Sequence, residues 1–418
     1  MYDWANSSFA VVVLTAFFPV LFKLFWDSGA GTALNTARLG FGDSTAGLIV
    51  AILSPFLGAI ADAGKAKKPF LAFFMVLGTI MTGCILFVGI GAWQTALFLF
   101  ILANIGFACG NLFYDSLLVI VAGRNDMDFV SSLGYATGYV GGGLLFLIDV
   151  LLVMFWQRLG LNSQLQATRI GFGLVAAWWF LFSLPIMLLV SEGKGKTTQN
   201  PLSVIANGLK RLKATSRKIV RDRLLILFIV AFWLYMDGVY TVITMAVNFG
   251  MSIGITSQTL MMTVLLVQFV AFPASLGFGY LAKAIGSGRA ISIGIAIYIL
   301  VCLTGFFILR TTPQFITLAC LVGMVQGGVQ ALSRSYFAKI IPAEDAAEYF
   351  GFLNLISRFS IVLGPVLVGA VTLLCRRAGG SEIFSSRCGM SSIAILFVGG
   401  GILLLLAEKE RARRIFAA

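Results

Sequence analysis

Long apolar runs, separated by short polar stretches, follow one another along the whole chain. Each run holds about 20 residues, which is enough to cross ~30 Å of hydrocarbon as an α-helix. The apolar residues are continuous rather than alternating, which excludes a membrane β-barrel. The pattern predicts twelve membrane-spanning helices, at roughly 4–26, 43–63, 69–91, 94–122, 130–156, 168–190, 224–249, 257–282, 289–309, 313–339, 349–374 and 389–407.

The second half of this pattern repeats the first. Three pairs of segments align at nearly the same offset: GAIADAGK with GYLAKAIG, FYDSLL with LSRSYF, and VSSLGYATGY with FGFLNLISRF. Six spans in each half, in this register, predict an all-α integral membrane protein with two pseudo-symmetric six-helix bundles, the organisation of the major facilitator fold. We expect the N-terminal bundle at 1–190, a linker at 191–223, and the C-terminal bundle with a short basic tail at 224–418.

Composition supports a membrane protein and argues against an enzyme. Of the 418 residues, 59% are hydrophobic and 11% are charged, whereas a soluble domain has about 25% charged residues. The loops leave no room for a soluble catalytic domain. The chain has no histidine, so histidine-based acid–base chemistry and a histidine-ligated metal site are excluded. We therefore expect no catalytic residues, no metal and no cofactor.

The net charge of +13 is a topology signal rather than a sign of nucleic-acid binding. With the N-terminus inside, most of the 30 Lys and Arg residues fall in the inner loops, which is the positive-inside bias. It predicts a cytoplasmic (inner) membrane location with both termini cytoplasmic. In the linker, Leu202, Ile205, Leu209 and Leu212 recur at helical spacing beside a basic face, which predicts a surface helix on anionic lipid; a regulatory partner site is the alternative.

Ionisable side chains inside spans are costly and usually mark function. By the repeat, Asp115 and Arg334 occupy equivalent positions. Their charges could meet in a central cavity, where a displaced partner would let the carboxylate take a proton; structural ion pairs are the alternative. Arg358 could clamp a carboxylate with two hydrogen bonds, and Asp237 is a second coupling candidate. We assign no role to Asp149.

The segment GAIADAGKAKKP predicts a gate. It has the form Gly-x-x-x-Asp-x-x-basic at a tight inner turn, with Asp62 and Lys65 at the key positions. Small residues let helices pack closely, so Asp62 could hold a neighbouring helix terminus or a loop cation such as Arg124. Lys283 stands at the equivalent place in the second half, so the sequence predicts only one complete latch.

Several segments together resemble a known family. YDWANSSFAVVVLTAFFPVLF, GAIADAGKAKKP, FYDSLL, MDGVYTVI, QALSRS and AEYFGFLNLISRFSIVLGP are similar to signatures of the major facilitator branch that includes the autophagy-type vacuolar amino-acid effluxers and their bacterial relatives. The resemblance implies a twelve-helix alternating-access carrier and amino-acid export. Its signature polar positions fall on Asp3, Asn6, Asp237, Ser333, Arg334 and Arg358, the last of which is often lysine in the family.

The two polar residues of YDWANS are expected to differ in role. Family members usually have several residues before this motif, whereas this chain has one. We therefore expect Asp3 to be exposed, as a helix cap or a cytoplasmic gate. Asn6 lies one turn deeper and aligns with Asp237 when WANSSFAVV is laid on YMDGVYTVI. We expect Asn6 to face the cavity.

The leading hypothesis is a gradient-driven carrier of a small zwitterionic or anionic metabolite, an amino acid, working as a monomer. Arg334 and Arg358 would bind a carboxylate, and Asp115 or Asp237 would carry a coupling proton. The alternatives are a carrier of lysolipids or drug-like amphiphiles and, from another class, a non-transporting membrane receptor. Cys375 and Cys388 are predicted at the outer ends of the last two spans, and whether they pair stays open.

Overall fold

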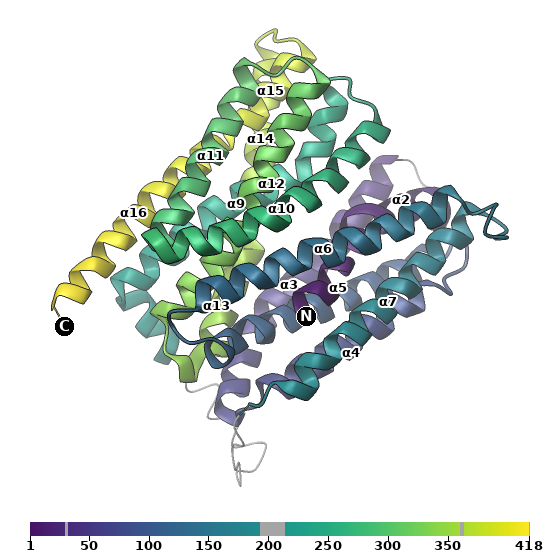
Figure 1. The fold of residues 1–418 in the computed structure, drawn as a ribbon. Helices are drawn as coiled ribbons and strands as arrows, with labels where there is room; N and C mark the ends of the chain where they lie inside the picture. Colours follow the sequence, from purple (N-terminus) through teal and green to yellow (C-terminus); the bar gives the residue numbers. More distant parts are fainter. Residues whose placement is uncertain (30–31, 193–213, 360–362, 418) are drawn as a thin grey trace. The chain divides into compact units, whose positions relative to one another are not determined.

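The computed structural model consists of helices joined by short loops (Figure 1). It describes residues 1–29, 32–192, 214–359 and 363–417. In this part of the chain, 11 helices are long and apolar enough to cross a membrane. The surface helix predicted in the linker falls largely on 193–213, outside the described residues.

The helices of the first half follow the predicted spans. They are α1 (Tyr2–Ser8), the π-helical η1 (Phe9–Phe17), α2 (Phe18–Leu21), the π-helical η2 (Phe22–Trp26), α3 (Thr32–Gly64), α4 (Lys67–Ile85), α5 (Trp93–Val121), α6 (Met127–Met154) and α7 (Gln164–Leu189).

The helices of the second half begin at the residue after Asp222. They are α9 (Arg223–Ser252), α10 (Ser257–Ile285), α11 (Ser287–Phe307), α12 (Thr312–Ile340), the short 3₁₀ turn η3 (Ala343–Asp345), α13 (Ala346–Phe359), α14 (Leu363–Arg377), α15 (Glu382–Ser392) and α16 (Ala394–Ala417).

The first span is continuous but not uniformly α-helical. Its π-helical segments are nine and five residues long, whereas π-helices usually occur as single-turn bulges, often at functional sites. Inside η1 the Thr15 hydroxyl donates to the carbonyl of Ala10, five residues earlier, at 2.9 Å. The apolar pattern predicted the span and not its winding.

The predicted eleventh span, 349–374, is described as two helices. α13 has 14 residues and α14 has 15. Residues 360–362 between them lie outside the described part, so the two described helices cover 349–359 and 363–374 of the predicted span.

Contacts between Cα atoms divide the chain into two compact units. Unit 1 comprises Met1–Val121, Thr137–Leu212 and Ala343–Leu355, and unit 2 comprises Ala122–Ala136, Lys213–Pro342 and Ile356–Ala418. Each unit thus takes up a short segment from the other half of the sequence. The start of α6 belongs to unit 2, and the start of α13 belongs to unit 1.

Unit 1 is built on close packing of α4 with α5 and α7, and of α5 with α3. A Cβ added at Gly106 would lie 2.6 Å from the backbone nitrogen of Gly78, so α4 and α5 touch through their backbones, as small residues allow in membranes. The large side chains Trp26, Phe113 and Trp179 are fully buried and fill the rest of this core.

Unit 2 is built on the pairs α9–α16, α10–α12, α11–α12 and α14–α15. A Cβ at Gly400 would lie 2.8 Å from the backbone nitrogen of Tyr235, so α16 and α9 also approach through a glycine. Cys375 in α14 and Cys388 in α15 are both free thiols in this structure.

Candidate functional site

Asp62, the predicted gate residue, lies at the end of α3 against the start of α13. Its Oδ2 accepts a hydrogen bond of 2.6 Å from the backbone N–H of Glu348. Gly58 permits this approach, because a Cβ there would lie 2.2 Å from the carbonyl oxygen of Ala347. Asp62 therefore binds a helix N-terminus, one of the two partners the sequence suggested, and the helix dipole favours a carboxylate there.

The cation beside Asp62 is not one that the sequence singled out. Lys67 places its Nζ 3.0 Å from Asp62 Oδ1, and both side chains are buried. Lys65 is exposed and has a left-handed backbone, with φ of 49°. Arg124 donates to the carbonyl of Lys339 at 3.0 Å. The described cation next to Asp62 is thus Lys67, and the gating roles of Lys65 and Arg124 stay predictions. Lys67 is the first residue of α4, so the turn that exposes Lys65 points Lys67 inward.

Glu192 joins this group from the end of α7. Its two carboxylate oxygens accept from the backbone N–H groups of Lys67 and Lys68, at 2.9 and 2.8 Å. It thus satisfies the N-terminus of α4, whose own N-cap residue, Ala66, has no side-chain acceptor. Sequence reasoning missed this residue, and its one signal was an isolated acid at the start of a basic linker.

Asp3 is buried, contrary to the expectation of an exposed cap. It is 8% exposed, and its Oδ2 accepts a hydrogen bond of 2.6 Å from the Tyr114 hydroxyl of α5. Within the described residues, no side chain caps α1. The first helix packs on α5 and α7 from its first turn, so closeness to the chain start does not mean exposure.

Asn6 is buried one turn deeper and pairs with another amide. Its Nδ2 lies 2.5 Å from Oδ1 of Asn111 on α5. Trp4 stacks on Trp178 with ring centroids 5.7 Å apart. The first span therefore carries a polar and aromatic face against α5 and α7. Neither Asn111 nor Tyr114 was predicted from the sequence.

Asp237 lies inside α9 and binds the backbone of α14. Its Oδ1 accepts from the backbone N–H of Gly364 at 2.9 Å and from the Thr241 hydroxyl at 3.3 Å. The side chain is fully buried, and its Oδ2 has no hydrogen-bond partner among the described residues. Arg358, predicted to bind a carboxylate, lies in α13, but its side chain is outside the described residues.

The other candidate charges are divided between the two units. Asp115 is half-buried on α5 in unit 1. Arg334, in unit 2, donates from Nε to the Ser131 hydroxyl at 2.8 Å and lies 4.7 Å from the Tyr135 ring. Asp149, to which we assigned no role, is fully buried against Gly171, and neither of its oxygens has a partner in the described part.

Comparisons with known proteins give a consistent result. The family model described as "Vacuole effluxer Atg22 like" matches residues 36–416. An uncharacterized MFS-type transporter, YxiO of Bacillus subtilis (strain 168), is 37% identical over 98% of this chain and 94% of its own length. Autophagy-related protein 22-1 of Aspergillus fumigatus is 26% identical over 68% of this chain and 49% of its own length.

Solved structures with the same fold are membrane transporters of low identity. The proton:xylose symporter XylE is 13% identical with a TM-score of 0.69, over 98% of this chain and 93% of XylE. The human organic anion transporter MFSD10 is 13% identical with a TM-score of 0.66, over 96% of this chain and 98% of its own. The predicted twelve-helix major facilitator fold is therefore confirmed.

Proposed function

Because the chain belongs to the Atg22-like family of vacuole effluxers and is a transporter of the major facilitator type, we propose that it carries a small zwitterionic or anionic metabolite. An amino acid is the substrate class that the resemblance to the vacuolar amino-acid effluxers implies. The carrier would act as a monomer in the cytoplasmic membrane, with both termini cytoplasmic, as the distribution of basic residues favours.

The observation that carries this proposal is the buried Asp237 carboxylate inside α9. Ionisable side chains inside membrane spans usually face the protein interior and mark the functional sites of transporters. Asp237 binds the backbone N–H of Gly364 in α14 with Oδ1, while its buried Oδ2 is unpartnered in the described part. That oxygen can take a proton or a donor group of a substrate.

In the mechanism we propose, Asp237 or Asp115 carries the coupling proton, and Arg334 and Arg358 bind the substrate carboxylate. Asn6 and Asn111 would add neutral hydrogen-bonding groups from the first span and α5. The Asp62–Glu348 contact would favour one conformation of the carrier. Its loss would shift the alternating-access equilibrium without removing a substrate contact.

Reconstitution in liposomes with an internal pH dye and a panel of neutral amino acids tests this function. We expect substrate-dependent proton movement that falls by on the order of tenfold or more in Asp237→Asn or Arg358→Gln, since the first removes a buried carboxylate and the second removes the charge proposed to bind the substrate. Asp126→Asn is the matched control, because its carboxylate is 64% exposed. Silence across the panel by a monodisperse protein, or movement of lysolipid instead, would contradict the proposal.

A further inference from the structure

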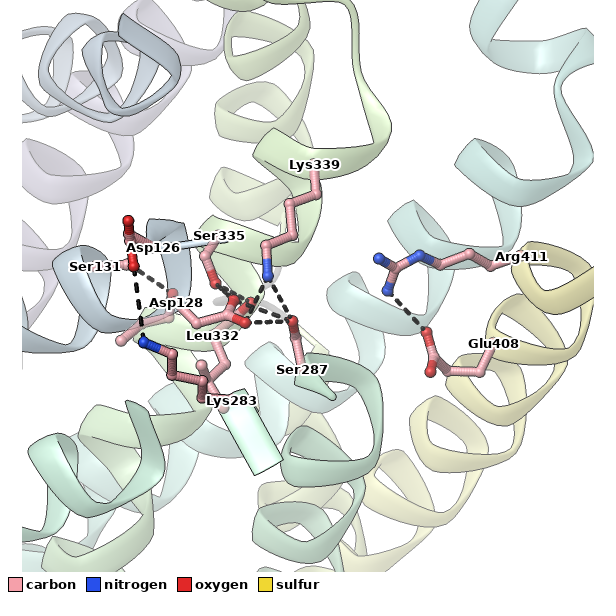
Figure 2. Close-up of polar contacts among 11 residues, drawn as sticks. Asp126, Asp128, Ser131, Lys283, Ser287, Leu332, Ser335, Lys339, Glu408 and Arg411 are labelled. Carbon is pink, nitrogen blue, oxygen red and sulfur yellow. Dashed lines mark hydrogen bonds and ion pairs between the residues drawn. The ribbon is translucent and has the colours of Figure 1, made fainter. Parts of the chain in front are cut away.

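Asp128 lies in the first turn of α6 and is bound to α11 and α12 (Figure 2). Its carboxylate accepts from the Ser335 hydroxyl at 2.6 Å, the Ser287 hydroxyl at 2.9 Å and Nζ of Lys339 at 2.5 Å. Asp128 is 5% exposed. A buried carboxylate is stable only with such partners, and here one cation and two hydroxyls supply them.

The start of α6 and the residues just before it are bound to α12 at two further points. We call residues 122–136 the α6 strap. Nη2 of Arg334 donates to the carbonyl of Ser131 at 3.0 Å, in addition to the bond from its Nε. Arg124 donates to the carbonyl of Lys339, near the end of α12. These hydrogen bonds connect the α6 strap to the helices of unit 2.

The internal repeat relates this cluster around Asp128 to the gate around Asp62. Asp62 of α3 aligns with Lys283 of α10, so the second half lacks the gate aspartate. In the same alignment Asp128 of α6 matches Glu348 of α13. In unit 1 the carboxylate belongs to the receiving helix, α3, and accepts from the incoming α13. In unit 2 the carboxylate belongs to the incoming α6, and the receiving helices supply the donors.

Lys283 itself does little in this cluster. Its Nζ lies 3.9 Å from Oδ1 of Asp126, and both side chains are about two-thirds exposed. An exposed ion pair at that distance contributes almost nothing to stability. The neighbouring acids Asp126 and Asp128 thus form a natural comparison, with one exposed and the other buried.

We propose that Asp128 is the gate carboxylate of the second half, and that its bonds to Lys339, Ser287 and Ser335 hold the α6 strap in unit 2 until transport requires its release. This deepens the proposed function, because it rests on alternating access. The carboxylate that makes the contact lies on the receiving helix in unit 1 and on the incoming helix in unit 2. Replacing Asp128 by asparagine would leave Lys339 buried without a counter-charge, which costs more than the pair itself contributes.

Hydrogen–deuterium exchange of the full-length protein, in vesicles of phosphatidylethanolamine and phosphatidylglycerol and without substrate, tests this gate. In Asp128→Asn we expect amide exchange in residues 122–136 to rise by on the order of tenfold or more, because a buried charged pair is broken. Ser335→Ala should give a smaller increase, since it removes one hydrogen bond. Asp126→Asn is the matched control and should leave exchange unchanged.

Exchange that rises evenly over all helices in Asp128→Asn, or does not rise in the strap, would overturn the gate. If Asp128→Asn does not fold, Ser335→Ala alone tests the gate. Unchanged exchange outside residues 122–136 then shows that the Ser335→Ala variant is folded. Restoration of slow exchange by the pair Asp128→Lys with Lys339→Asp would support the charge-specific role. No substrate is used, so failure of the amino-acid assay leaves this result interpretable.

Discussion

At the scale of single residues, two buried aspartates of this protein accept hydrogen bonds from the backbones of other helices. Asp62 accepts from the N–H of Glu348 in the first turn of α13, and Asp237 accepts from the N–H of Gly364 in α14. The first turn of a helix leaves N–H groups unpaired and carries the positive end of the dipole. An aspartate inside a span therefore does not by itself indicate a substrate contact, because it also satisfies the backbone of a neighbouring helix.

Gly364 gives a prediction at this scale. A Cβ there would lie 1.9 Å from the Thr241 hydroxyl and 2.7 Å from Oδ1 of Asp237. We expect Gly364→Ala to destabilise the protein by about 1–3 kcal/mol, as overpacking of a filled site does. Thermal unfolding in detergent measures the loss.

Two further variants complete this test. Gly369 lies in the same helix, and a Cβ there would meet no described atom within 4 Å, so Gly369→Ala should leave the melting temperature nearly unchanged. Adding Thr241→Ala to Gly364→Ala should recover part of the loss, because it removes the atom that clashes. Equal melting temperatures for the two alanine variants would contradict the close contact.

At the scale of helices, Asp222 connects the start of α9 with the end of α16. It accepts from the N–H groups of Leu224 and Leu225, and from the Arg414 guanidinium at 2.7 Å. Partial burial alone would raise the pKa of Asp222, but hydrogen bonds from Arg414 and the backbone outweigh it and lower the pKa below its ordinary value. The contact orders two helix ends that are far apart in the sequence.

This contact predicts a pH-dependent stability. Because folding lowers the pKa of Asp222, its contribution is fully present above the ordinary value of about 4 and is lost as the pH falls through the folded-state value. Asp222→Asn keeps a helix cap but removes the charge, so the wild-type advantage should be ~0.5–1 kcal/mol at neutral pH and vanish on acidification. Melting temperatures from pH 7 to pH 3 measure it.

The control for this prediction is Arg413→Gln. Arg413 is 63% exposed, and its Nη1 lies 3.9 Å from Glu410, so its variant should follow the wild type at every pH. A stability difference between Asp222→Asn and the wild type that grows below pH 4 would contradict a lowered pKa for Asp222.

Also at this scale, the sequence predicted where the spans lie better than how they are wound or bonded. Apolar run length locates a membrane helix, but it does not distinguish α from π winding in Phe9–Phe17. The position of Asp3 in the sequence predicted an exposed side chain, whereas Asp3 is buried and accepts a hydrogen bond from the Tyr114 hydroxyl of α5. Such partners lie more than a hundred residues away, and spacing along one chain carries no signal for them.

In the candidate site, too, the sequence predicted local features but not the partners that come from other helices. The gate motif correctly indicated that Asp62 holds a helix terminus, because its small residues and turn are local features. It did not identify Lys67 or Glu192 as members of the group, since their orientation follows from where α4 begins and α7 ends. The buried role of Asp128 had one sequence signal, its alignment with Glu348 in the repeat.

At the scale of the whole molecule, neither half of the sequence contains a complete unit. Unit 1 includes Ala343–Leu355, and unit 2 includes Ala122–Ala136. The exchanged segments make polar contacts with their units. The Glu348 N–H donates to Asp62, and the Asp128 carboxylate accepts from Lys339. Each half of the sequence alone would leave a buried charge without its partner, which is costly.

We therefore predict that the two halves fold together and not separately. Fragments 1–200 and 201–418, expressed alone, should yield no monodisperse protein, whereas co-expression should let a tag on one fragment recover both in equal amounts. Size-exclusion chromatography after extraction in mild detergent makes the measurement. A single fragment that elutes as a sharp peak with a cooperative melt would contradict the exchange of segments.

The exchanged segment at the start of α6 also has a consequence for biosynthesis. Asp128 and Lys339 are separated by 211 residues, and at about 5–20 residues per second the ribosome needs roughly 10–40 s to make the chain between them. During that time α6 enters the membrane with an acidic first turn that has no cation to bind. The insertion machinery must keep this turn in water until most of the remaining chain has been translated, so unit 2 is completed late in synthesis.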